Sequence, residues 1–188
     1  MADSGKDSNT LNNPQVTNKS QPSQVLCTNF NQDASSVCVG TKSGLRIWNI
    51  GNAGQEVQPL HKDESNLRIS LAARLFSSSL LVIVSQAQPR KLRVFHFRKD
   101  TEICAYSYSS AILSVKLNRL RLVVMLENGI YIHNIKDMKL LNHIKDIPTN
   151  PRGVCCLSTT SHHPLLVYPG STVNGQVHVY DCESLQIM

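Results

Sequence analysis

Thiol and imidazole groups are the side chains of this chain that could bind a metal ion or act as nucleophiles. The six cysteines are four scattered residues and one adjacent pair: Cys27, Cys38, Cys104, Cys182 and Cys155-Cys156. A zinc site or a disulfide framework needs C-x-x-C pairs or Cys/His clusters at ligand spacing, and the sequence has neither. His162-His163 stands in a polar Ser/Thr segment, where exposure is expected in preference to metal ligation. We therefore expect reduced, structural cysteines, no metal site and no cofactor.

The positive charge of the chain is concentrated in its middle third. The formal net charge is +6, and the segment from Ser85 to Lys145 alone carries +7. Its four acids are Asp100, Glu102, Glu127 and Asp137. Its eleven basic residues are Arg90, Lys91, Arg93, Arg98, Lys99, Lys116, Arg119, Arg121, Lys136, Lys139 and Lys145. We expect this segment to form one structural region that attracts acidic partners.

Several classes of function find little support in the sequence. The charge would permit nucleic-acid binding, but aromatic residues make up only 5% and no RRM, KH or helix-turn-helix signature occurs. There is no nucleophile elbow, P-loop, metal motif or recognisable pair of carboxylates, so we do not expect an enzyme. No apolar run is long enough for a transmembrane helix, and the N-terminus MADSGKDSNT has no apolar core of a signal peptide. The expected location is cytoplasmic.

The elements that must position these side chains are predicted to be strands. Residues 1–23 are polar and rich in Ser, Asn, Gln and Pro, and we expect them to be disordered. From Gln24 onward, short apolar runs are separated by turn signals, and several alternate with polar residues, as in residues 129–135.

Four of the expected strands repeat one pattern, with apolar residues at the second and fourth positions and a ring at the fifth. They are GLRIWN, KLRVFH, GIYIHN and QVHVYD, which start at residues 44, 91, 129 and 176. These separations bracket the period of WD-type propeller blades. The ring residues Trp48, Phe95, His133 and Tyr180 are expected to pack between blades, with His133 donating a structural hydrogen bond.

The repeat predicts an all-β, WD40-like β-propeller over residues 24–188, with about three and a half blades of an expected seven. The blades are placed at approximately 24–65, 66–110 and 111–150, followed by an incomplete blade at 151–188, whose outer strand should run where the chain ends at Met188. On the repeat alone, an ordinary β-sandwich remains the alternative.

Eight short stretches, spread in order over residues 24–186, carry a family resemblance. They are FNQD (30–33), RLFSSSL (74–80), PRKL (89–92), TEIC (101–104), VKLNR (115–119), YIHNI (131–135), NPRG (150–153) and YPGS (168–171). Together they resemble the PROPPIN family of WD-repeat phosphoinositide-interacting proteins, and in particular its WIPI-type members that act early in autophagosome formation.

The resemblance implies a non-enzymatic autophagy scaffold whose full-length members bind phosphatidylinositol 3-phosphate and 3,5-bisphosphate. In the family, a Phe/Leu-Arg-Arg-Gly motif between the fifth and sixth blades holds the lipid, because arginine pairs well with phosphate. That motif does not occur here, and the nearest trace, Arg152-Gly153, is interpreted as a turn before a strand. We expect no lipid-binding residues in this chain. The full-length protein would be recruited peripherally from the cytoplasm to phagophore, pre-autophagosomal or endosomal membranes.

The resemblance also implies a protein-docking groove between the second and third blades. In the family it receives an acidic segment of the scaffold subunit of the ubiquitin-like lipidation machinery. The matching residues here are His96, Lys99, Ile103, Arg119 and Lys139, which all fall inside the basic middle third of the chain. Solvated charges that contribute little are the alternative interpretation of these residues. A truncated product without independent function, or a generic WD-repeat interaction module, also remains open.

Overall fold

The computed structural model of the chain describes residues 23–51, 56–160 and 162–188. The predicted disordered tail, residues 1–23, lies outside this part except for Ser23. In the described residues no helix is long and apolar enough to cross a membrane.

Four antiparallel sheets of four strands follow one another along the chain, and we number them sheet 1 to sheet 4. Sheet 1 comprises β1 (Val25–Phe30), β2 (Ser36–Thr41), β3 (Gly44–Asn49) and β4 (Gln58–Asp63). Sheet 2 comprises β5 (Ile69–Arg74), β6 (Leu80–Ser85), β7 (Gln88–His96) and β8 (Thr101–Ser107). Sheet 3 comprises β9 (Ser114–Leu117), β10 (Arg121–Leu126), β11 (Gly129–Asn134) and β12 (Leu140–Lys145). Sheet 4 comprises β13 (Cys156–Leu157), β14 (Leu165–Pro169), β15 (Val177–Asp181) and β16 (Gln186–Ile187).

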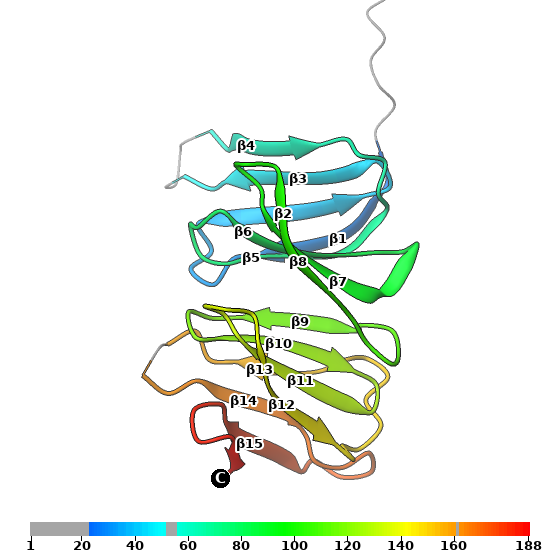
Figure 1. The fold of residues 1–188 in the computed structure, drawn as a ribbon, viewed down its shortest axis with the longest axis vertical. Coiled ribbons are helices and arrows are strands. Elements are labelled where there is room, and N and C mark those ends of the chain that lie inside the picture. Colours follow the sequence, from blue (N-terminus) through cyan, green and yellow to red (C-terminus); the bar gives the residue numbers. More distant parts are fainter. Residues whose placement is uncertain (1–22, 52–55, 161) are drawn as a thin grey trace, which may run out of the picture.

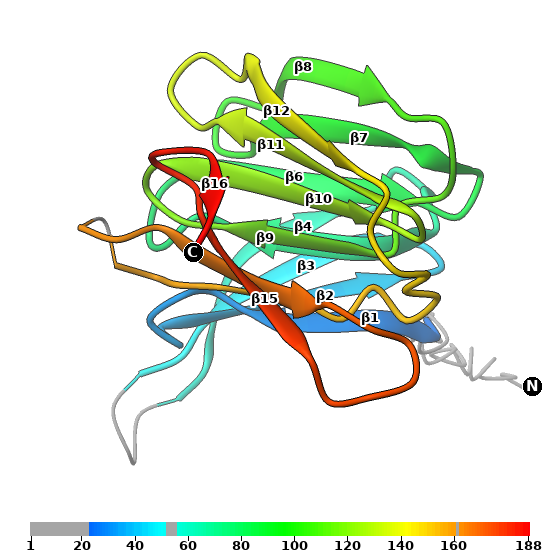
Figure 2. The same cartoon turned by 90° about the horizontal axis from the view of Figure 1, so that it is seen from below.

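The sheets succeed one another along the long axis of the molecule, from sheet 1 to sheet 4 (Figure 1). Within each sheet the strands stand in sequence order, which Figure 2 shows most clearly for β9 to β12. Sheet 4 has two short strands, β13 and β16, and the second of these ends one residue before Met188. This is the blade-by-blade arrangement that the repeat predicts, and the all-β fold class is confirmed.

Each junction between neighbouring sheets encloses its own hydrophobic core. Leu45 and Ile47 of sheet 1 pack with residues of sheet 2 such as Leu81. The junction of sheets 2 and 3 contains Leu92 and Leu122, among others, and a third cluster lies between sheets 3 and 4. Because one sheet cannot bury both of its faces alone, the stacking of blades supplies most of the hydrophobic stabilisation.

Strand β10 shows how this burial dictates the sequence. Leu122 and Val124 point into the junction with sheet 2, whereas Val123 and Met125 point into the junction with sheet 4. All four side chains are fully buried. A strand covered on both faces needs a continuous apolar run rather than alternation, which is what residues 122–126 provide.

The ring positions of the repeat are structurally equivalent across the sheets. Trp48, Phe95 and His133 each follow a register shift between the third and fourth strands of their sheet. Phe95, His133 and Tyr180 face the preceding sheet. His133 is 2% exposed, and its Nδ1 donates a hydrogen bond to the Met138 carbonyl at 3.1 Å, as predicted.

The six cysteines are free thiols in the structure. Burial raises the pKa of Cys38 and Cys182 to about 12, and it also raises the pKa of Cys27, Cys104 and Cys155. A thiol that stays protonated at neutral pH is a poor nucleophile and a poor metal ligand, so these five residues act as small hydrophobic side chains.

Candidate functional site

The turns that carry the predicted site residues lie at one end of sheets 2 and 3. In an antiparallel sheet the first and third turns share an end, so β5–β6 lies beside β7–β8 and β9–β10 beside β11–β12. We call these four turns the basic rim. Their basic residues are Arg98, Lys99, Arg119, Lys136 and Lys139, against the acids Asp100 and Asp137, and all seven side chains are exposed.

Arg119 is the arginine of the rim that contacts the neighbouring sheet. It stands in the β9–β10 turn, and its Cζ lies 4.3 Å from the ring centroid of Phe76 in the β5–β6 turn of sheet 2. Among the described residues it forms no side-chain hydrogen bond and no ion pair. A guanidinium that lies over a ring and has free N–H groups can donate two parallel hydrogen bonds to a carboxylate.

Lys99 and His96 lie on the β7–β8 turn at the end of β7. The backbone N–H of Lys99 donates to His96 Nδ1 at 3.3 Å, so the imidazole helps to close this turn. Lys99 itself is exposed and has no ion-pair partner among the described residues. Its ammonium can add attraction at longer range.

Ile103 lies on β8 and is 49% exposed. Val94 pairs with Cys104 and Phe95 with Glu102, so Ile103 is the unpaired residue of the register shift between these strands. A bulge of this kind redirects a side chain and interrupts the ladder at the outer edge of the sheet. Ile103 therefore presents an apolar surface at the outer strand of sheet 2.

Lys139 lies on the β11–β12 turn, and its Nζ is 3.9 Å from Asp137 Oδ2. The neighbouring Met138 carbonyl accepts hydrogen bonds from Tyr106 Oη of β8, at 2.7 Å, and from His133 Nδ1. The bond from Tyr106 ties the outer strand of sheet 2, which also carries Ile103, to the turn of sheet 3 beside Lys139. The bond from His133 closes that turn within sheet 3.

The same junction continues inward through a buried hydrogen bond. His133 Nε2 lies 2.9 Å from Tyr108 Oη, and because Nδ1 carries the proton for Met138, the Tyr108 hydroxyl donates to Nε2. Burial lowers the pKa of His133, the hydrogen bond to Met138 opposing this in part, and burial raises the pKa of Tyr108. The polar groups inside this junction, Tyr108 and His133, are thus neutral and hydrogen-bonded, while the rim above them is charged.

The five predicted site residues are therefore gathered at one end of sheets 2 and 3, on four different elements. Among the described residues, the hydrogen bond within this set joins Lys99 and His96, and the other three share the same end of the two sheets. The wider expectation is that residues 85–145 form one structural region, and they make up β7 and β8 of sheet 2 and all of sheet 3. Their basic side chains, however, are divided between the two ends of these sheets. Arg90 and Lys91 begin β7 and Lys145 ends β12, at the opposite end from the rim, because strands carry the chain across the whole sheet.

Sequence reasoning missed the residues that hold the rim in place. Phe76 supports Arg119, while Tyr106 and the Met138 carbonyl join the two sheets. An aromatic residue inside the polar turn FSSS was a visible signal for Phe76. Nothing in the sequence could indicate a backbone carbonyl as the shared acceptor.

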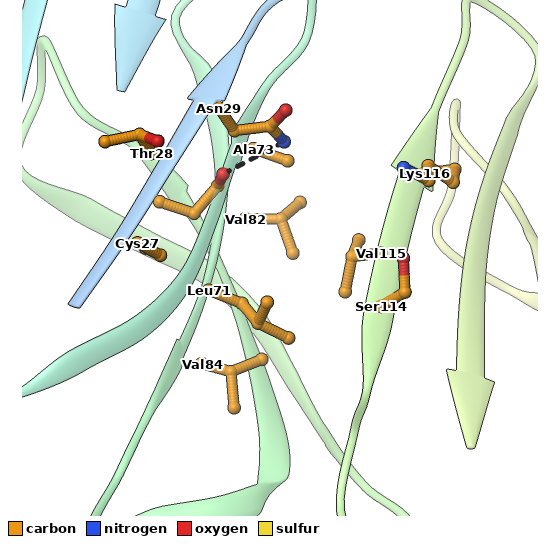
Figure 3. Close-up of a pocket in the computed structure, with 11 residues that line it drawn as sticks. Cys27, Thr28, Asn29, Leu71, Ala73, Val82, Val84, Ser114, Val115 and Lys116 are labelled. Atoms are coloured by element: carbon orange, nitrogen blue, oxygen red, sulfur yellow. Dashed lines mark hydrogen bonds between the residues drawn. The ribbon is translucent and has the colours of Figure 1, made fainter. Parts of the chain in front are cut away.

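A cavity of about 200 Å³ opens on the inner side of the same junction, between β1, β5, β6 and β9. Figure 3 shows Val82 and Val84 facing Val115 and Ser114 across it. Its ionisable lining groups are the Cys27 thiol and Lys116, and burial raises the pKa of Cys27. The cavity lies between inner strands of sheets 1, 2 and 3, and polar side chains such as Thr28, Asn29 and Ser114 share its wall with aliphatic ones.

The sequence Asn150-Pro151-Arg152-Gly153 forms a turn before β13. The Asn150 side chain brackets it, accepting from the Val154 N–H at 3.0 Å and donating to the Val154 carbonyl at 2.9 Å. Gly153 has a φ of +60°, and a Cβ at this position would lie 2.6 Å from Leu113 Cβ. Arg152 is exposed in this turn, at the end of the sheets opposite to the basic rim.

Comparison with curated proteins finds close relatives. The chain is 48% identical to human "WD repeat domain phosphoinositide-interacting protein 1" over 164 residues, which cover 87% of the chain and 36% of that protein. It is also 48% identical to mouse "WD repeat domain phosphoinositide-interacting protein 2" over 163 residues, again 87% of the chain and 36% of the relative. The chain thus spans little more than a third of the length of these relatives.

Solved structures and a family model agree with these relatives. A complex of KlAtg21 with the coiled coil of AgAtg16 contains a similar chain, with a TM-score of 0.68 and 25% identity over 88% of this chain and 54% of that one. The fold is therefore that of a β-propeller, of which the four sheets are successive blades. The PROPPIN family model matches residues 24–188. The chain belongs to the PROPPIN family.

Proposed function

We propose that this chain is part of a non-enzymatic autophagy adaptor whose basic rim docks an acidic segment of the scaffold subunit of the ubiquitin-like lipidation machinery. The observation that carries the proposal is the state of Arg119. Its guanidinium is exposed, stacked on Phe76, and without an ionic or hydrogen-bond partner among the described residues. A carboxylate of the partner would accept hydrogen bonds from the free N–H groups of this guanidinium.

The surroundings of Arg119 favour an acidic partner. Five basic residues stand on the rim against two acids, and Lys99 and Lys139 would attract an approaching acidic segment. Ile103 would contribute an apolar contact for the same segment. The KlAtg21 complex, with the coiled coil of AgAtg16, supplies the type of partner: a coiled coil from the autophagy machinery.

The full-length protein would reach its membrane through phosphoinositides, since the human and mouse relatives are named as phosphoinositide-interacting. This part of the activity needs the Arg-Arg-Gly motif, which the 188 residues do not contain. We expect the chain not to float with liposomes in a manner that depends on phosphatidylinositol 3-phosphate. Flotation that depends on phosphatidylinositol 3-phosphate would refute the proposal that these 188 residues lack the lipid site.

The docking proposal is tested by measuring the affinity of the chain for a purified Atg16 coiled coil by isothermal titration calorimetry. The variant Arg119→Glu should bind about tenfold more weakly or worse, because it places like charges in contact. Arg152→Glu is the matched control, since it makes the same change of charge at an exposed arginine of the opposite end. Equal losses in both variants, or no loss in Arg119→Glu, would contradict docking at the rim.

A further inference from the structure

The residues that follow the first turn-closing residue of three successive sheets form a chain of contacts from sheet 1 to sheet 3. The turns are closed by Asn31 N–H to Ser36 O, Leu75 N–H to Leu80 O, and Asn118 N–H to Arg121 O. The residues that follow these closing positions are Gln32, Phe76 and Arg119. Gln32 contacts Phe76, and Phe76 contacts Arg119. A line of equivalent positions therefore runs across sheets 1, 2 and 3 and ends at the rim.

Phe76 adopts a backbone conformation that a bulky residue rarely occupies. Its φ is +43°, in the left-handed region, which costs of order 1 kcal/mol or more for an L-residue with a side chain. Gln32 of sheet 1 holds it there by two hydrogen bonds. The Gln32 Oε1 accepts from the Phe76 N–H, and the Gln32 Nε2 donates to the Arg74 carbonyl at 3.1 Å.

The consequence of this conformation is the placement of the aromatic ring against Arg119. The guanidinium lies over the ring, which covers part of it, and its N–H groups have no hydrogen-bond partner among the described residues. A side chain that is already held in one pose loses less conformational freedom when a partner binds. Strain in a turn that orders a binding group is a recurring feature of functional sites.

We propose that Phe76 is a positioning residue of the docking site: its ring holds the Arg119 guanidinium flat, so that the open edge takes a partner carboxylate, and Gln32 fixes Phe76 in turn. This inference rests on the proposed function, because it assumes that an acidic segment docks at the rim.

The left-handed conformation of Phe76 offers a variant that separates binding from folding. Phe76→Gly removes the ring but suits the backbone, since glycine adopts a positive φ without a steric penalty. We expect the melting temperature of this variant to stay within a few degrees of wild type, while its affinity for the Atg16 coiled coil falls about three- to tenfold. Phe76→Tyr keeps the ring and should retain the affinity of wild type.

A double-mutant cycle identifies the group through which Phe76 acts. In an Arg119→Ala background, Phe76→Gly should cause no further loss of affinity. The matched control is Phe95→Leu, which removes another arginine–phenylalanine contact of sheet 2, in which Arg93 Cζ lies 4.8 Å from the ring centroid. Arg93 is already paired with Glu102 at 2.6 Å, so this variant should leave the affinity unchanged.

The outcomes distinguish this inference from the docking proposal. If the wild-type chain does not bind the coiled coil, the proposed function fails. If Arg119→Ala weakens binding but Phe76→Gly does not, docking stands and the role of Phe76 is refuted. An equal effect of Phe76→Gly with and without Arg119 would also refute it. If Phe76→Gly fails to fold, Gln32→Ala replaces it, with an expected loss of about two- to threefold; full affinity of that variant overturns the inference.

Discussion

Arg119 and Arg121 are two residues apart at the β9–β10 turn, yet they serve different junctions. Arg121 faces sheet 4, where its Nε donates to the Cys182 carbonyl at 2.7 Å, while its Nη1 donates to the Leu120 carbonyl at 3.1 Å. Arg119 faces sheet 2 and contacts the ring of Phe76. The donors of Arg121 are used by the fold, whereas those of Arg119 are open to a partner.

The two junctions differ in the same way around these arginines. Between sheets 3 and 4, Asn118 Nδ2 donates to the Ser158 carbonyl at 2.9 Å, so the polar groups of these turns are hydrogen-bonded across the junction. Between sheets 2 and 3, the polar contacts lie deeper, at Tyr106, Tyr108 and His133, and the rim itself is left cationic. A charged group contributes to stability where its hydrogen bonds are internal and to recognition where they are not.

The largest change in stability is expected at the connection between sheets 3 and 4. Gly153→Ala would force a side chain into the left-handed region and bring its Cβ to 2.6 Å from Leu113 Cβ. We expect the free energy of unfolding to fall by about 2–4 kcal/mol, measured by urea denaturation. Binding of the Atg16 coiled coil by the folded fraction should not change. A variant as stable as wild type would show that this turn does not constrain the junction.

Urea denaturation should also show different losses of stability for variants of Arg121 and Arg119. Arg121→Ala removes a charged donor from the Cys182 carbonyl and should cost about 1.5–3 kcal/mol of unfolding free energy. Arg119→Ala should change it by no more than about 0.5 kcal/mol. If the two variants were equally destabilised, the distinction between a structural and a recognition arginine would be lost.

The interior of the junction between sheets 2 and 3 should make stability depend on pH. Burial lowers the pKa of His133 from 6.5, so the unfolded chain binds this proton more readily than the folded one. The contribution of neutral His133 to the free energy of unfolding is therefore complete above about pH 6.5. It is lost as the pH falls below this value, and the free energy of unfolding then changes by at most about 1.4 kcal/mol per pH unit. In His133→Gln this part of the pH dependence, followed by urea denaturation between pH 7 and pH 5, should disappear. Equal slopes in both proteins would contradict a neutral, buried His133.

The smallest effects are expected from the lysines of the rim. Lys99→Ala should lower the association rate with the coiled coil about twofold at low salt and less at physiological ionic strength. Lys139→Ala should have a weaker effect, because Asp137 already lies 3.9 Å from its ammonium. Biolayer interferometry at two salt concentrations measures both. A change confined to the dissociation rate would place these lysines inside the contact and not around it.

The fold could be predicted from the sequence because the strand pattern repeats. The ring positions Phe95 and His133 marked equivalent places in successive sheets, and short apolar runs such as residues 122–126 indicated the neighbouring strands. Two-residue strands such as β13 and β16 carry too little pattern to be located in this way.

The site was only partly predictable. Arg119 and Lys139 could be selected by resemblance, but sequence proximity does not reveal which end of a sheet a residue occupies. Charge counting therefore places Arg90 and Lys145 in the same basic segment as Arg119. The contact of Phe76 with Arg119 depends on a left-handed residue and on a hydrogen bond from another sheet. Such features arise from tertiary packing and have no local signature.

A charge-swap experiment tests the central claim, that Arg119 takes a partner carboxylate, most directly. The affinity of the Arg119→Glu chain is measured against a set of Atg16 coiled coils, each with one Asp or Glu changed to Arg. We predict that one member of the set restores binding to within about threefold of the wild-type pair and binds the wild-type chain poorly. If the wild-type pair binds and no member of the set rescues Arg119→Glu, the claim is contradicted.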